Sequence, residues 1–510
     1  MKPILLTGGT IRTMDPARPL ADELLVAGER IADRCAAEPE RVELGGACVL
    51  PGFTDSHTHF PTWAAAQQQI RLEGAPTLDA ALDRVAAAAR ALPPGARWLR
   101  GVGWRAGDWD PPAEPTRQML DRAAPGVGVA LMSRDYHSLW LSSEALARAD
   151  AELLVPGGVV ELDDAGEPTG VLREESAWRF RDRWAAPTHD EYLEAMRAGL
   201  PLAASRGVTA IHDKDGWLGA LELFQRLHAG GELTLRVWQS VPHERLDALA
   251  ALGLRSGFGD DWLRLGYVKA FMDGTVGSAT ARLLDGSGVQ ITSREDFEAI
   301  VRRAARAGFP VAVHAIGDLA NREALDAFEA AAGEWRPRGL RQRIEHAQLL
   351  AAEDVARFAR IGVTASVQFS HAPSDRDLAD RAWSGRTQGA YAYGSLLAAG
   401  ARLVDGSDAP VEELDPLQGL RAGVLRTLDH RPPWHPENAV GVEAALRAIT
   451  AEPAWLSYAE DRRGRLAPGM LADLVVLDRD PLAVPPEELP RLRVLGTMAG
   501  GRWTHRDGGF

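Results

Sequence analysis

The sequence predicts an α/β fold, specifically a (β/α)8 barrel, and three observations lead to this prediction. Apolar strand-like runs alternate with amphipathic helix-like runs, which is typical of a parallel sheet covered by helices. The chain has 510 residues, more than one hydrophobic core usually organises, so one large domain with attachments is expected. Polar side chains end several strand-like runs, as they do at the mouth of a barrel.

Six runs in the body of the chain each combine a strand-like stretch with the loop that follows it. In order they are LPLAASRGVTAIHD, WLRLGYVKAFMDG, GFPVAVHAIGD, GLRQRIEHAQ, GVTASVQFSHAP and GARLVDGSDAP. Helices are predicted over residues 293–308 and 318–334, where acidic residues near the start favour a helix N-terminus. Repeated strand, loop and helix at this length make a TIM barrel the best prediction.

The two ends of the chain resemble each other and differ from its body. Residues 1–52 and 461–510 hold short strand-like runs broken by Gly-rich turns. Neither end has enough strands for a sheet of its own, so we expect them to pair into one small composite β-sandwich domain. Residues 53–70 and 191–460 then form the barrel. Residues 71–190, rich in Trp and Pro, are predicted to be an inserted domain covering the barrel mouth.

The composition excludes several classes of protein. A net charge of −14 disfavours nucleic acid, whose binding depends on Lys and Arg neutralising phosphates. Cys35 and Cys48 allow at most one disulfide and no clustered thiolate metal site. The first apolar run is too short for a signal peptide, and no run is long enough to span a membrane. We therefore expect a cytoplasmic protein.

His57 and His59, in the segment PGFTDSHTHF, are the first candidate metal ligands. Side chains at positions i and i+2 of a strand point to the same face, so both imidazoles can bind one ion. An HxH pair also arises by chance, and two loop histidines are the alternative.

Three further polar residues strengthen the metal interpretation. His314 ends FPVAVH, His346 ends RIEH, and Asp408 follows ARLVDGS. Strand ends of a barrel converge on one mouth, where catalytic residues lie. The alternatives are a hydrogen-bonded core histidine for His314 and a helix N-cap for Asp408. Taken together, the set predicts a metal site.

The sequence resembles the amidohydrolase superfamily, family 3, the YtcJ-like metal-dependent hydrolases, which include N-substituted formamide deformylases. The resemblance covers nearly the whole chain. It depends on HTH after PGFTDS, on VHAIGD, RIEHAQ and GSDAPV in this order, and on RDYHSLWLSSEAL, YVKAFMDGTVGSATA and GRLAPGMLADLVVLDRDP.

The resemblance implies that Lys269, in YVKAFMDG, is carbamylated and bridges two divalent metal ions, with zinc as the expected ion. A carbamate turns a cationic side chain into an oxygen donor. The alternative is an unmodified lysine paired with Asp273, and a single ion would then be expected.

The resemblance also implies a division of the ligands and a mechanism. One ion is bound by His57, His59, Lys269 and Asp408, and the second by His314, His346 and Lys269. A metal-bound hydroxide attacks the substrate, and Asp408 acts as general base and then general acid.

Three residues are candidates for binding substrate. His137 lies in the inserted region and is expected to hydrogen-bond the substrate carbonyl; Tyr136 stands where the family usually has Gly. His371 ends ASVQFSH at an expected mouth position. Trp104 lies among glycines in GVGWRAGDWD, which indicates a loop, whereas most of the other Trp residues there are expected in the core.

The predicted function is hydrolysis of a non-peptide C–N bond in a small molecule, an N-acyl or N-formyl amide. The alternatives are a cyclic-amide, carbamate or lactone hydrolase on the same site, and a catalytically silent metal-binding barrel. No nucleic-acid or membrane partner is expected, and a homo-oligomer is left open.

Overall fold

The computed structural model describes residues 2–93, 95–96 and 98–508. The described chain divides into two compact units. The first unit contains residues 2–60, 196–272 and 292–508, and the second contains residues 61–195 and 273–291. The two units are described one after the other.

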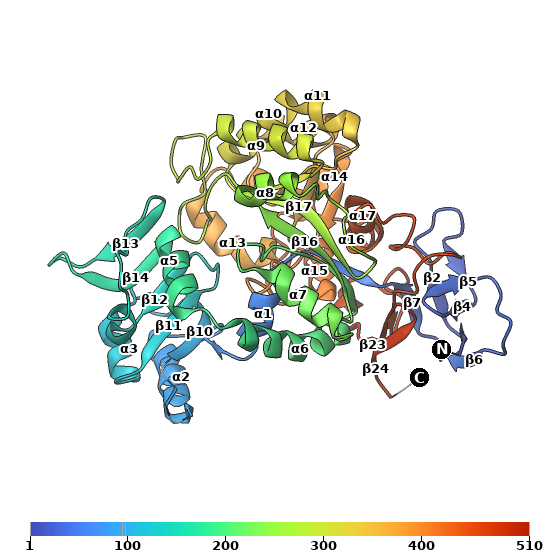
Figure 1. Cartoon of the computed structure of the whole chain (residues 1–510), viewed down its shortest axis with the longest axis horizontal. Helices are drawn as coiled ribbons and strands as arrows, with labels where there is room; N and C mark the ends of the chain where they lie inside the picture. The colour runs from blue at the N-terminus through green and yellow to red at the C-terminus, as the bar shows by residue number, and fades with distance from the viewer. Residues whose placement is uncertain (1, 94, 97, 509–510) are drawn as a thin grey trace. The chain divides into compact units, whose positions relative to one another are not determined.

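An eight-stranded parallel sheet forms the centre of the first unit, and it is a nearly closed barrel (Figure 1). Its strands are hydrogen-bonded in the order β21-β20-β19-β18-β17-β16-β15-β8, and a bridge between Thr58 and Ala409 links the two outer strands. Their bounds are β8 Phe53–Thr58, β15 Val208–Asp213, β16 Arg236–Pro242, β17 Leu263–Phe271, β18 Val311–Ala315, β19 Arg343–His346, β20 Thr364–Val367 and β21 Leu403–Asp405. The barrel predicted from the sequence is confirmed.

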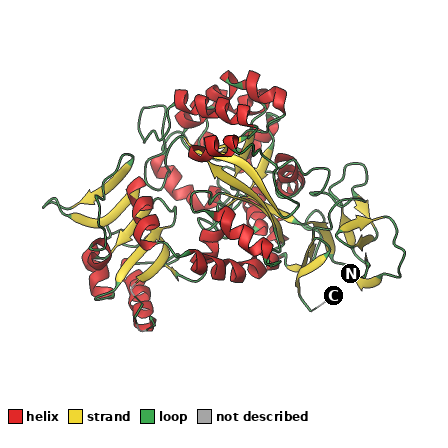
Figure 2. Cartoon of the chain, viewed as in Figure 1, coloured by secondary structure: helices red, strands yellow, loops and turns green. Residues whose placement is uncertain are grey.

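Helices follow the barrel strands, as the alternating sequence pattern predicts (Figure 2). They include α6 His189–Ser205, α7 Ala220–Ala229, α8 Leu246–Ala251, α9 Arg294–Ala307, α10 Asp318–Ala330, α12 Ala352–Ile361, α13 His371–Ala382, α14 Tyr393–Ala398, α15 Pro416–Leu425, α16 Val442–Ala448 and α17 Ala451–Leu456. The Ser293 hydroxyl caps α9 by accepting from the Asp296 N–H, and Gly308 ends it at φ 81°. The two predicted helices coincide with α9 and α10, and the second prediction runs on into α11, Ala332–Trp335.

The two ends of the chain supply the remaining sheets of the first unit, and they pair with each other in the six-stranded sheet, as predicted. The four-stranded sheet is built from residues 4–43 alone, so the prediction that neither end has enough strands for a sheet of its own is wrong. A four-stranded sheet has the order β5-β4-β1-β6, and a six-stranded sheet has the order β24-β23-β22-β7-β2-β3. The strands are β1 Ile4–Thr7, β2 Thr10–Arg12, β3 Leu20–Ala21, β4 Leu24–Ala27, β5 Arg30–Ala32, β6 Glu40–Glu43, β7 Cys48–Pro51, β22 Leu474–Leu477, β23 Val494–Ala499 and β24 Arg502–Arg506. Apolar side chains of both sheets, such as Leu24 and Val476, share one core.

The second unit is built on a mixed six-stranded sheet in the order β13-β14-β12-β11-β10-β9. Its strands are β9 Ile70–Arg71, β10 Trp98–Trp104, β11 Gly128–Ser133, β12 Ser138–Leu141, β13 Gly158–Leu162 and β14 Pro168–Glu174. Apolar residues of α2 (Leu78–Ala91) and α3 (Arg117–Ala123) pack into one core cluster of this unit, and residues of α5 (Glu175–Phe180) into another.

Residues 273–291 belong to this second unit, whereas the sequence analysis assigns them to the barrel. Hydroxyl–carboxylate hydrogen bonds hold them there. Thr275 donates to Asp135 at 3.1 Å, and Ser278 and Thr280 donate to Glu174 at 2.7 and 2.8 Å. These partners lie more than 100 residues away along the chain, so no local pattern indicates the packing.

Two absences can be stated for the described residues. None of their helices combines the length and the apolar character that crossing a bilayer requires. Cys35 and Cys48 are not joined by a disulfide bond.

Candidate functional site

Polar side chains from several strands meet at the carboxyl end of the barrel. They are His57 in β8, His59 just after it, Lys269 in β17, His314 in β18, His346 at the end of β19 and Asp408 shortly after β21. Nitrogen or oxygen atoms of His57, His346 and Asp408 lie within 4.8 Å of one another, close enough to bind one ion. The convergence expected from strand-end positions is thus present in the structure.

Asp408 lies between the two histidines of the HxH pair. Its Oδ1 is 3.2 Å from Nε2 of His57 and 3.6 Å from Nε2 of His59. Both imidazoles therefore direct the same nitrogen toward one carboxylate oxygen. This is the shared face that the i, i+2 spacing predicts.

The other ring nitrogen of each histidine donates to a second carboxylate. His57 Nδ1–H donates to Glu345 at 2.7 Å, and His59 Nδ1–H donates to Asp215 at 2.7 Å. Because a carboxylate accepts, the proton must be on Nδ1, and the Nε2 lone pair is left for a cation. Carboxylate–histidine–metal arrangements of this kind orient ligands in metalloenzymes.

Glu345 belongs to a buried charged network below His57. It also accepts from Lys214 Nζ at 3.1 Å and from Arg343 Nη2 at 3.0 Å. Burial acts to raise the pKa of Glu345, but the charges of Arg343 and Lys214 and the hydrogen bond with His57 hold it well below its usual value. Glu345 is therefore an anion that fixes the orientation of His57.

His314 and His346 extend the row of imidazoles. The ring centroid of His346 is 4.8 Å from that of His57 and 4.5 Å from that of His314. His346 is also bonded through Nδ1 to Gln368 Oε1 at 2.8 Å. Burial, together with the neighbouring His314, lowers the pKa of His346 well below its usual value. A neutral imidazole is the form that binds metals.

Lys269 is buried beside these ligands. Its Nζ has no hydrogen-bond partner among the described residues and lies 4.3 Å from the ring centroid of Phe271. Burial lowers the pKa of Lys269 to about 8, although Glu345 and Asp408 act to raise it. A buried amine without a partner is costly, so the site is complete only when this nitrogen gains a further interaction.

Asp408 is held in an unusual backbone conformation. Its φ is 56°, in the left-handed region, and its N–H donates to the His57 carbonyl at 2.6 Å. Non-glycine residues at positive φ carry strain and cluster at functional sites. Burial acts to raise the pKa of Asp408, but its interaction and hydrogen bond with His57 hold this pKa well below its usual value, so Asp408 is ionised.

The donor set fits a divalent metal ion. It combines imidazole nitrogens, an ionised carboxylate and a buried amine without a hydrogen bond among the described residues. Imidazole and carboxylate are the ligands of catalytic zinc sites. The residues present therefore suit the metal that the sequence predicts.

Comparison with known proteins decides the family. A family profile described as "Amidohydrolase family" matches residues 40–505. The chain belongs to the amidohydrolase family. It is 32% identical to YtcJ of Bacillus subtilis (strain 168), over 93% of this chain and 92% of that protein. It is 29% identical to the N-substituted formamide deformylase of Arthrobacter pascens, over 98% of each chain.

A solved structure agrees with the fold of this amidohydrolase. The uncharacterized metal-dependent hydrolase from Pyrococcus horikoshii OT3 superposes with a TM-score of 0.77 at 26% identity. The alignment covers 95% of this chain and 99% of the other. The likeness therefore extends over barrel, composite β-domain and second unit alike.

The three substrate-binding candidates of the amidohydrolase lie in different surroundings. His371 begins α13, is buried, and stacks on His346 with ring centroids 6.4 Å apart. His137 lies in the second unit, where it is bonded to Glu174 at 2.6 Å. Trp104 lies in a core cluster of the same unit and is 3% exposed, and its indole N–H donates to the Leu131 carbonyl at 2.8 Å. The environment of Trp104 is that of a packed core residue.

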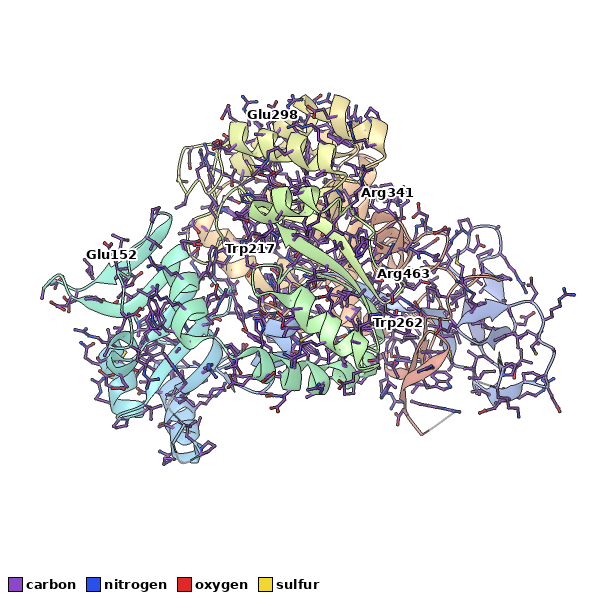
Figure 3. All side chains as sticks on the ribbon, in the orientation of Figure 1. Glu152, Trp217, Trp262, Glu298, Arg341 and Arg463 are labelled. Carbon is purple, nitrogen blue, oxygen red and sulfur yellow. The ribbon has the colours of Figure 1, made fainter. Side chains whose placement is uncertain are left out.

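Several residues near the histidines were not predicted from the sequence. Glu345, Lys214 and Asp215 contact the histidines or each other. In the sequence, however, each is an ordinary charged residue at or near the end of a strand. Trp217, labelled in Figure 3, is 44% exposed and lies 5.5 Å from Phe271 between ring centroids. The signal for Trp217 was its place in HDKDGW, directly after a strand that ends at the barrel mouth.

Proposed function

We propose that this amidohydrolase cleaves a C–N bond other than a peptide bond in a small molecule, specifically an N-acyl or N-formyl amide. The observation that carries the proposal is the meeting of His57, His346 and Asp408 within 4.8 Å at the mouth of the barrel. The amide class is supported by the likeness to an N-substituted formamide deformylase over 98% of each chain.

The proposed metal is zinc, held by imidazole and carboxylate groups. One ion would be held by His57, His59, Lys269 and Asp408, and a second by His314, His346 and Lys269. When bound there, a divalent ion lowers the pKa of water and polarises a carbonyl oxygen.

Lys269 joins the two proposed sets of ligands only after modification. Its unprotonated Nζ adds to the carbon of CO2, an N–C bond forms, and one proton leaves the nitrogen for solvent. The product is a carbamate anion with two oxygen donors. This modification also removes the buried, unpartnered amine described above. Without the carbamate, a single ion is proposed.

Asp408 is the proposed proton carrier. Its ionised carboxylate accepts a proton from the water that adds to the amide carbonyl. It then gives this proton to the nitrogen as the C–N bond breaks, so that the products are a carboxylic acid and an amine. Its position 3.2 Å from His57 Nε2 places the carboxylate beside the proposed ion.

The substrate end of the site offers an aromatic surface. Between ring centroids, Phe271 lies 5.3 Å from His314 and 5.5 Å from Trp217, which is exposed. Exposed aromatic area of this kind suits an apolar substituent. We therefore propose amides with an aryl or alkyl substituent.

The function is tested with zinc-loaded protein and a panel of aryl- and alkyl-substituted formamides, N-acyl amides, a cyclic amide, a carbamate and a lactone. We expect amine release from the formamides or acyl amides. Asp408→Asn should keep part of its metal and lose about 10²–10⁴-fold in turnover, the usual contribution of a positioned proton carrier. Asp247→Asn, at a side chain 82% exposed, is the matched control.

Three results would contradict the proposal or one of its parts. Full metal content without turnover on the panel would favour a silent metal-binding barrel. Turnover confined to the cyclic amide, carbamate or lactone would favour the corresponding hydrolase. Near wild-type turnover of metal-loaded Asp408→Asn would assign the proton transfer to another residue.

A further inference from the structure

A cavity lined by arginines and apolar side chains lies in the first unit, at the opposite end of the barrel from the histidines. Its volume is about 180 Å³. Arg402, which lines it, directly precedes β21, and Thr54, bonded to the lining residue Arg463, stands near the start of β8. These are the amino ends of the same strands whose carboxyl ends lead to His57 and Asp408. The cavity is therefore not part of the site described above.

The lining of the cavity is rich in guanidinium groups. Four arginines line it, Arg402, Arg447, Arg463 and Arg465, against the two carboxylates of Glu452 and Glu460. A protein with a net charge of −14 does not attract anions through its overall field. The local excess of positive charge is therefore a specific feature of the lining of this cavity.

The two carboxylates are already paired. Glu452 accepts from Arg447 at 2.7 Å and also from Arg402. Glu460 accepts from Arg341 at 2.5 and 3.0 Å, and Arg341 comes from outside the cavity lining. Neither carboxylate is left to balance Arg463.

Arg463 is the lining arginine for which the described residues form no ion pair, although Asp473 acts on its charge from a longer distance. Its side chain is buried, with 7% of the residue exposed, and it donates to the hydroxyls of Thr54 at 3.0 Å and Ser457 at 2.8 Å. The described residues place no carboxylate within 4.0 Å of its guanidinium. Burial, together with the charge of nearby Arg264, lowers the pKa of Arg463 to about 9, although Asp473 acts to raise it. Figure 3 labels Arg463 together with Arg341.

We propose that this cavity, lined by Arg463, Arg447 and Arg465, binds a small oxyanion, a carboxylate or a phosphate. Guanidinium groups match the geometry of both anions. Met14, Pro16 and Trp455 supply an apolar wall that suits a carboxylate with an apolar body. The cavity is smaller than the 300–1,000 Å³ typical of sites for drug-sized ligands, which excludes a nucleotide or a large cofactor.

The test uses full-length, zinc-loaded protein and three probes at constant ionic strength: inorganic phosphate, benzoate and uncharged benzamide. Calorimetric titration and the midpoint of thermal unfolding are measured. Phosphate or benzoate should bind and raise the midpoint, and benzamide should do neither. Whichever anion binds more tightly identifies the class of ligand.

Variants assign the binding to this cavity. Arg463→Met should weaken anion binding at least tenfold while zinc affinity stays the same. Arg447→Met should also weaken it and serves if the first variant does not fold, because Glu452 keeps Arg402 as a partner. Arg491→Met, at a side chain 72% exposed, is the matched control. Binding of neither anion, equal binding of benzamide, or anion binding unchanged in both cavity variants would overturn the proposal.

Discussion

Replacing Glu345 by glutamine tests how the structure prepares His57 for a metal ion. The carboxylate accepts from His57 Nδ1 at 2.7 Å, from Lys214 at 3.1 Å and from Arg343 at 3.0 Å. Glutamine keeps the shape of the side chain but removes the negative charge. It leaves one oxygen to accept hydrogen bonds where the carboxylate had two.

The expected effect of Glu345→Gln has two parts, a loss of metal affinity and a loss of stability. His57 loses the partner that fixes its proton on Nδ1, and changes of this kind lower metal affinity about 10–100-fold, or roughly 1.4–2.7 kcal/mol. Lys214 and Arg343 have side chains 0% and 2% exposed and lose their counter-ion. Breaking a buried ion pair costs about 3–5 kcal/mol, a large share of a typical stability of about 5–15 kcal/mol.

Zinc affinity is measured by competition with a chelator, and stability by urea unfolding with zinc removed. Glu334→Gln is the matched control, since Glu334 pairs with Arg302 in a partly exposed position, and it should cost less than about 1 kcal/mol. A Glu345→Gln variant with wild-type zinc affinity would show that the carboxylate does not orient His57. A stability loss equal to that of the control would show that the buried network is not coupled to the fold.

Three further predictions concern the ligands and one buried ion pair. His57→Ala and His314→Ala should each lose metal and activity while circular dichroism stays unchanged; full metal occupancy in both would remove them from the set of ligands. Lys269→Ala should lower metal stoichiometry and activity together, with partial rescue of turnover by small carboxylic acids; an unmodified amine beside two occupied ions in a crystal structure would contradict the bridging role. Asp473 is bonded to Arg236 at 2.6 and 2.8 Å; burial acts to raise its pKa, but Arg236 lowers it overall. The stabilising effect of this ion pair is therefore present above the unfolded pKa of about 3.9 and is lost as pH falls. In urea unfolding, Asp473→Asn should be about 3–5 kcal/mol less stable than wild type at pH 7 and closer to wild type below pH 4. A stability difference that does not change with pH would refute the assignment.

The fold could be predicted from sequence because local patterns repeat. Each barrel strand is an apolar run followed by a polar end, and parallel strands buried on both faces require such runs. His57, His59, His314, His346 and Asp408 could be predicted to lie close together because a barrel brings its strand ends together whatever their separation in sequence. The pairing of the two termini in the six-stranded sheet was expected from their similar strand-like runs, but the amino-terminal strands also complete a four-stranded sheet by themselves.

The network behind the histidines could not be predicted in this way. Lys214 and Glu345 are 131 residues apart, and their pairing depends on which side chains at the carboxyl ends of β15 and β19 turn inward at the same height. Residues 273–291 present a similar problem, because their partners Asp135 and Glu174 lie in the second unit. Trp104 shows the reverse: neighbouring glycines indicate a loop, but the residue ends a strand and its ring packs in a core.

The antiparallel pairing of β7 with β22 has a consequence for synthesis on the ribosome. Val49 pairs with Val476, so the partner strand β22 is translated more than 400 residues after β7. At about 5–20 residues per second, the delay is on the order of 20–90 s. During this time an apolar strand edge near the amino terminus is open to other nascent chains. We therefore expect a chaperone to bind the nascent chain until its last strands are translated. A chain that lacked those strands would keep that edge of β7 exposed permanently.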